Sequence, residues 1–158
     1  MEISQLVQEI QYILAPAIMI SSSALLLLGF QNKFSNLADR FRGLNQEKRR
    51  LFQKADRTPE EERHLSNLSG QIEYLFRRAS HVKNAILLTY GAVVFFTGTS
   101  ILILFNIYFV RQLYPYIIVT AAIGLSLLFL TALIMLAEAR LIFRVLALEK
   151  KSCLADVQ

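Results

Sequence analysis

Several polar side chains that could bind or guide ions lie within or next to long apolar runs of this sequence. In the last run and directly after it, Thr120, Gly124, Thr131 and Glu138 are separated by four, seven and seven residues. This spacing puts them on one stripe of a helix. Hydroxyl groups and a carboxylate on one stripe are what a hydrated path for ions needs, and Glu138 would be the charged site at its end.

Hydroxyl groups in the two earlier apolar runs could line the same path. The candidates are Ser21 and Ser22 in the first run, and Thr89, Thr97 and Ser100 in the second. If identical subunits surrounded an axis, Glu138 would form a ring of carboxylates that attracts cations. Glu9, near the opposite end of the first run, could form a second ring.

Helix packing is the alternative interpretation, and it is the preferred one for the hydroxyl groups. Small and hydroxyl-bearing residues let membrane helices approach closely, and a hydroxyl can bond to its own backbone. Such residues form short stripes that suit contacts between helices or subunits, at Ala17, Ser21 and Ala24 and at Ala122 and Ser126. For Glu138 the alternative is a salt bridge to Lys33 or Lys83, which should lie at a similar depth.

Charged residues near the ends of the apolar runs form a second group of candidates. Asp39 can pair with Arg42 at a three-residue spacing, which would support a helix. The functional alternative is a contact with another subunit or with an anionic lipid. The candidates for that contact are Lys33, Asp39, Arg40, Arg42, Arg78 and Lys83.

Enzyme chemistry finds little support in the sequence. Glu61 and His64 make one Glu-x-x-His spacing, but a helical two-metal site needs two such pairs, and Arg78 stands where the second glutamate would precede His81. Phosphate-binding glycine loops, zinc-ligand spacings and a nucleophile elbow are also absent from the sequence. We therefore predict no catalytic residues, no metal and no cofactor.

Three apolar runs position these residues. Residues 12–30, 85–110 and 116–137 contain no Asp, Glu, Lys or Arg, and 54% of the 158 residues are hydrophobic. About 20 apolar residues at 1.5 Å each cross a hydrocarbon core of about 30 Å. The sequence therefore predicts an all-α membrane protein of one domain, residues 1–158, with three transmembrane helices. Arg111 to Pro115 is left as a tight turn between the last two.

The segment between the first two spans, residues 33–84, has the pattern of an antiparallel helical hairpin. Apolar residues recur there at alternating steps of three and four, with one gap at Lys48. They are Phe34, Leu37, Phe41, Leu44, Leu51 and Ala55 in the first arm, and Leu65, Leu68, Ile72, Leu75, Ala79 and Val82 in the second. Thr58, Pro59 and Glu61 mark the start of the second arm with a capping box. Each arm should be continuous with its span.

The distribution of charge predicts the orientation. Of the 17 Lys and Arg residues, only Arg111 lies between the second and third runs. The positive-inside rule therefore places the hairpin and the tail, residues 138–158, in the cytoplasm and the N-terminus outside. Acidic residues alternate with the basic ones in the hairpin, which argues against nucleic acid. Anionic lipid at the cytoplasmic face is the expected partner.

The segment from Leu14 to Asn45 resembles the bacterial membrane family called domain of unknown function 2721. The resemblance is carried by an apolar run opened by Pro16, then Asn32 with Lys33, then a D-R-x-R stretch formed by Asp39, Arg40 and Arg42. It implies a three-pass plan over almost the whole chain in the bacterial inner membrane. It implies no biochemical role.

Taken together, these patterns predict a homo-oligomer that conducts ions or regulates their conduction. Three spans enclose no pore by themselves, so a path would require several copies. The alternative is a non-conducting scaffold or regulatory subunit whose hairpin docks a cytoplasmic or membrane partner.

Overall fold

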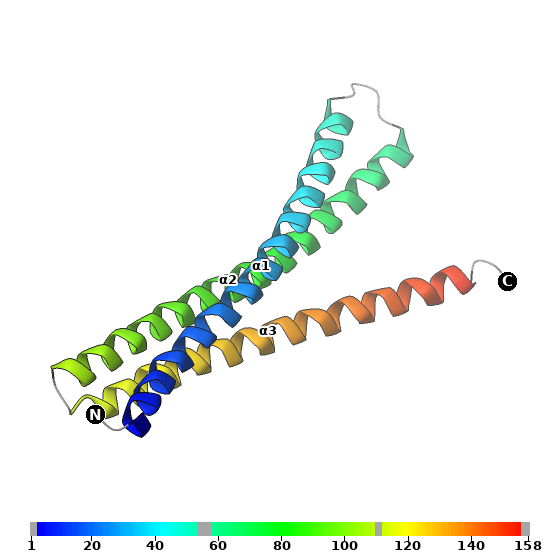
Figure 1. Ribbon diagram of the computed structural model, residues 1–158. Coiled ribbons are helices and arrows are strands. Elements are labelled where there is room, and N and C mark those ends of the chain that lie inside the picture. The colour runs from blue at the N-terminus through cyan, green and yellow to red at the C-terminus, as the bar shows by residue number, and fades with distance from the viewer. Residues whose placement is uncertain (1–2, 54–57, 110–111, 156–158) are drawn as a thin grey trace.

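Over the residues that it describes, the computed structural model consists of three long helices (Figure 1). Helix α1 spans Ile3–Phe52, α2 spans Pro59–Tyr108 and α3 spans Tyr114–Ala155. The structure describes residues 3–53, 58–109 and 112–155, with side chains described for 11–12, 14–53, 58–109 and 112–140. The first two helices each join an apolar run to an arm of the hairpin, as predicted. Helix α1 continues through Pro16, which is buried.

All three helices are long and apolar enough to cross a membrane, over Leu14–Phe52, Pro59–Tyr108 and Tyr114–Arg140. Many of their large apolar side chains face outward, among them Leu25 on α1, Val94 on α2 and Phe129 on α3. In water such a surface would be costly, because each apolar side chain kept in water forfeits about 1.5–3 kcal/mol of burial. A lipid environment removes that cost.

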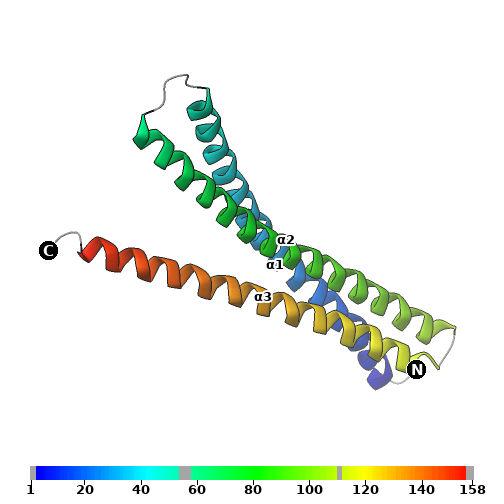
Figure 2. The same cartoon turned by 180° about the vertical axis from the view of Figure 1, so that it is seen from behind.

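Helix α2 packs against both other helices. Its buried residues follow one unbroken series of three-, four- and seven-residue steps, which is one helical stripe. They are Leu68, Leu75, Val82, Ala85, Thr89, Ala92, Phe96, Thr99, Ile103 and Asn106. Figures 1 and 2 show α3 beside α2 near the Tyr114 end and separated from it toward Ala155.

The hairpin arms pack through the predicted apolar series, except at Phe34, which is exposed. Leu37, Leu75 and Val82 form a buried cluster that Leu44, Ile86 and Met135 extend. The rings of Phe41 and Phe76 lie 6.4 Å apart, centroid to centroid. Met135 comes from α3, so this core lies where all three helices meet. Ala55, the last residue predicted for the first arm, lies outside the described residues.

The second arm begins as its sequence predicts. Pro59 is the first residue of α2, and the backbone N–H of Thr58 donates to Glu61 Oε2 at 3.1 Å. Glu60, Glu61 and Glu62 occupy the first turn, where acidic side chains stabilise the positive end of the helix dipole. The start of this arm is therefore fixed by local interactions.

The turn between α2 and α3 differs slightly from the prediction. Tyr114 and Pro115 belong to the first turn of α3 rather than to the turn itself, because proline fits the first helical turn without losing a hydrogen bond. Asn106, which is buried near the end of α2, accepts a hydrogen bond from the Leu113 N–H at 3.1 Å. This bond ties the start of α3 back to α2.

Replacing Asn106 by leucine should therefore loosen this turn. The Leu113 N–H would lose its acceptor, and a net hydrogen bond contributes about 1 kcal/mol. We expect a lower midpoint of thermal unfolding in detergent. Gln112→Leu, at an exposed position in the same turn, is the control and should leave the midpoint unchanged. Equal midpoints for the two variants would mean that the side chain of Asn106 does not hold the turn.

Candidate functional site

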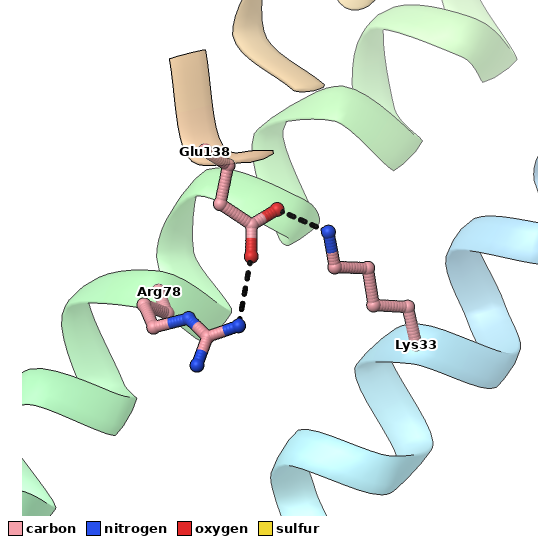
Figure 3. A network of polar contacts seen from close by, with 3 residues as sticks. All are labelled: Lys33, Arg78 and Glu138. Carbon is pink, nitrogen blue, oxygen red and sulfur yellow. Dashed lines mark hydrogen bonds and ion pairs between the residues drawn. The ribbon is translucent and has the colours of Figure 1, made fainter. Parts of the chain in front are cut away.

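Glu138 lies at a junction of all three helices. It comes from α3, and only 2% of its side chain is exposed. Lys33 Nζ of α1 lies 2.8 Å from its Oε2, and Arg78 Nη2 of α2 lies 3.5 Å from its Oε1 (Figure 3). A buried carboxylate is stable as an anion only if opposite charge and hydrogen bonds replace its water. Lys33 and Arg78 supply both.

The helices present these three side chains to one another through the same stripes that form the core. Arg78 lies between Leu75 and Val82, both buried, at steps of three and four. Its guanidinium also lies over the ring of Tyr74, 5.7 Å from the centroid, a distance suited to a cation–π contact. Packing on both sides therefore fixes where the guanidinium lies.

A pocket of about 590 Å³ adjoins this junction. It is lined by residues of α1 and α2, namely Lys33, Asn36, Leu37, Asp39, Arg40 and Arg78. Arg78 Nε is buried and has no hydrogen-bond partner among the described residues. Lys33, Arg40 and Arg78 bring three positive charges to the pocket. Asp39 and the adjoining Glu138 bring two negative charges, which leaves an excess of one positive charge.

The structure pairs Glu138 with one of the two lysines that the sequence offered. Lys33 makes the predicted salt bridge, whereas Lys83 lies at an exposed position on α2. Arg78 makes the second contact, although the sequence suggested it only as a lipid or subunit contact. Asp39 pairs with Arg42 at 3.4 Å as predicted, and because both are largely exposed the pair adds little stability.

The hydroxyl groups proposed as a path bond to their own helices. Each donates to the backbone carbonyl four residues earlier; the donors are Ser21, Ser22, Thr89, Thr97, Ser100, Thr120 and Thr131. Thr89 and Thr131 are buried, whereas Ser21, Ser22 and Thr97 are exposed. In one chain, therefore, they do not share a surface. The side chain of Glu9 lies outside the described residues.

Three polar residues inside the bundle were not among the predicted site residues. Ser23 is fully buried, and Thr99 and Asn106 are nearly so. The hydroxyl oxygens of Thr99 and Thr120 lie 3.1 Å apart and join α2 to α3. The signal for Thr99 and Asn106 was present in the sequence, since both continue the Leu68–Leu75–Val82 series in steps of three and four.

Comparison with known proteins agrees with the resemblance seen in the sequence. Residues 13–148 match the family described as protein of unknown function DUF2721. The chain belongs to this family. No curated protein and no solved structure gave a significant match. The segment shared with DUF2721 includes Lys33, Arg78 and Glu138, so the whole junction lies within the part that defines membership.

Proposed function

We propose that this chain is a non-conducting membrane scaffold or regulatory subunit, built as a homo-oligomer, whose hairpin docks a partner. The double neutralisation of Glu138 carries this proposal. A carboxylate that attracts permeating cations must have negative charge to spare, whereas Glu138 already faces two cations within 3.5 Å. Its geometry suits a joint between helices better than a binding site for mobile ions.

The distribution of basic residues supports a cytoplasmic hairpin and C-terminus with the N-terminus outside, in the inner membrane of a bacterium. Lys33, Arg78 and Arg140 all lie toward the hairpin end of the apolar segments. Positive-inside topology would put that end at the cytoplasmic face. The hairpin would then stand in the cytoplasm as a preformed surface for a partner.

Exposed small residues support the homo-oligomer. Ala17, Ser21 and Ala24 are exposed on α1, and Ala122 and Ser126 are exposed on α3. Small side chains that face lipid make few packing contacts, whereas small side chains that face another helix allow the two backbones to approach closely. These two stripes are the surfaces on which we expect copies of the chain to meet.

An ion-conducting or ion-regulating homo-oligomer is the second candidate. Exposed Ser21, Ser22 and Thr97 favour it, because hydroxyl groups on the outside of one chain could line a path between several chains. This candidate places the path between subunits, away from Glu138.

Ion flux in reconstituted liposomes separates the two candidates. We expect the protein to give the same potassium and sodium flux as protein-free liposomes, while migrating as an oligomer in mild detergent. Flux above that background which falls on Thr97→Val or Ser21→Ala would favour conduction instead. A protein that stays monomeric in detergent and in lipid would contradict both candidates.

A further inference from the structure

We propose that the pocket beside Glu138 binds the phosphate group of an anionic phospholipid. The proposal rests on the membrane insertion inferred above, and it holds whether or not the assembly conducts ions. The pocket is the one formed by Lys33, Asn36, Leu37, Asp39, Arg40 and Arg78, with a volume of about 590 Å³. A phosphate group and part of a glycerol headgroup fit within that space.

The charge of the pocket selects an anion. Lys33, Arg40 and Arg78 bring three positive charges to it, and Asp39 and Glu138 offset only two. Asp39 Oδ1 also lies 3.4 Å from Arg42 Nη1, and Arg42 is not among the residues that line the pocket, so part of the charge of Asp39 is balanced outside it. A singly charged phosphodiester would balance the remaining excess.

The pocket also holds more hydrogen-bond donors than its own acceptors use. The Arg78 guanidinium has five N–H donors, and Glu138 accepts from Nη2 at 3.5 Å. Arg78 Nε is buried without a partner among the described residues, and a buried donor without an acceptor is unfavourable. The Asn36 amide and the Lys33 ammonium line the same pocket. Phosphate oxygens are the acceptors that such a donor set matches best.

The position of the pocket favours a lipid as the source of that phosphate. Lys33 and Arg78 lie where the apolar segments give way to the charged hairpin, the level at which lipid headgroups would lie. Apolar side chains next to the junction, Phe34 on α1 and Leu133 and Leu136 on α3, are exposed. Acyl chains could cover them while the headgroup occupies the pocket. A soluble anion would gain nothing from these side chains.

A tryptophan placed beside the pocket can report the bound lipid directly. The chain has no tryptophan, and Phe34, which is 37% exposed and adjacent to Lys33, is a conservative position for one. Quenching of Phe34→Trp fluorescence by brominated phosphatidylglycerol, compared with brominated phosphatidylcholine, measures the preference for the anionic lipid. We expect phosphatidylglycerol to be preferred about five-fold, the attraction one basic residue usually provides near an anionic surface.

The pocket variant is Arg40→Gln, and its matched control is Arg49→Gln, at an exposed position of the same helix. Both remove one positive charge from α1, but only Arg40 lines the pocket. Arg40→Gln should lose most of the preference, and Arg49→Gln should keep it. Equal losses in the two variants would reduce the effect to general surface charge and overturn the proposal. Arg78→Gln is a weaker test, because it also breaks the contact with Glu138.

Two further measurements identify the source of the bound phosphate and detect a failure of the protein to insert into the membrane. Excess inorganic phosphate should not displace brominated phosphatidylglycerol beyond the effect of chloride at equal ionic strength; displacement would assign the pocket to soluble phosphate and overturn the lipid source. Quenching by brominated phosphatidylcholine in every variant reports membrane insertion itself. Its loss would contradict insertion, whereas equal quenching by the two lipids would contradict only the preference of the pocket for an anionic phospholipid.

Discussion

Glu138→Lys is expected to prevent the three helices from packing, with a loss of about 3 kcal/mol or more in the free energy of unfolding. Removing one partner of a buried ion pair usually costs about 3–5 kcal/mol, because a buried charge is left without compensation. Here the new ammonium would also face Lys33 and Arg78, at a position where only 2% of the side chain is exposed. The measurement is unfolding of the purified protein in mixed micelles, with size-exclusion chromatography to detect aggregation.

Three companion variants test whether charge at this junction is the cause. Glu138→Gln keeps the shape and should cost less, since Lys33 and Arg78 remain 34% and 19% exposed and can reach water. Adding Lys33→Glu to Glu138→Lys should recover part of the loss by restoring an ion pair between α1 and α3. Glu73→Lys, a reversal at an exposed position of α2, should change stability by less than about 0.5 kcal/mol. A Glu138→Lys protein as stable as this last variant would show that the junction does not hold the helices together.

This expectation also bears on function. If Glu138 served a mobile ion, its replacement by glutamine would alter flux at little cost in stability. If Glu138 instead holds the three helices together, the same replacement lowers stability and leaves the ion flux of the liposomes unchanged. The junction suits a scaffold, because it connects α1 and α2, at the base of the hairpin, to α3.

The architecture could be predicted from the sequence because it depends on patterns of many residues. Runs without charge, such as residues 85–110, set the length of each apolar segment. The seven-residue spacing of Leu68, Leu75 and Val82 determined which face of the second arm is buried. The capping residues Thr58 and Glu61 located the start of α2. The third span was predicted to begin at residue 116, whereas α3 begins at Tyr114. The difference of two residues arose because Pro115 suits a turn and a first helical turn equally well.

The site could be predicted only in part, because its contacts join residues far apart in the chain. Glu138 stood out as an acid at the end of an apolar run, and depth along the helix offered Lys33 and Lys83 as alternative partners. Depth alone could not choose between Lys83 and Arg78 for the second contact. That choice depends on helix rotation, which places Arg78 between the buried Leu75 and Val82.

The hydroxyl groups illustrate the same limit. In the first helix, Ser21, Ser22 and Ser23 are consecutive, and composition does not distinguish them. Counting back from the buried Leu37 through Leu27 in steps of three, four and seven leads to Ser23, which is the buried one. The register of the hairpin therefore continues into the membrane segment and could have selected Ser23 beforehand.

Gly124→Leu should force α2 and α3 apart. An added Cβ at Gly124 would lie 2.9 Å from Cε1 of Phe96, closer than Cβ atoms normally approach another atom, and 3.1 Å from its Cδ1, which is also tighter than most contacts. Phe96 is itself nearly fully buried, so its ring has little room to move aside. Overpacking of this kind costs about 1–3 kcal/mol, and Leu adds three more carbons beyond the Cβ. The expected result is a lower unfolding midpoint in micelles, together with weaker protection of α3 amides from hydrogen exchange.

Two controls separate the effect of the site, Gly124, from the effect of the added side-chain volume. Gly29→Leu introduces the same side chain on α1, where nothing lies within 4 Å of an added Cβ, and should leave stability unchanged or slightly raised, because glycine is a poor helix former. Phe96→Ala combined with Gly124→Leu returns volume to the contact and should recover part of the loss. The contact is specific to this pair only if the double variant is more stable than the sum of the single effects predicts. Strict additivity would mean that the two helices do not pack through this glycine.

The same variant should also disturb the junction at Glu138. Because Gly124, Thr131 and Glu138 share one stripe of α3, separation near Gly124 should also lengthen the contacts of Glu138.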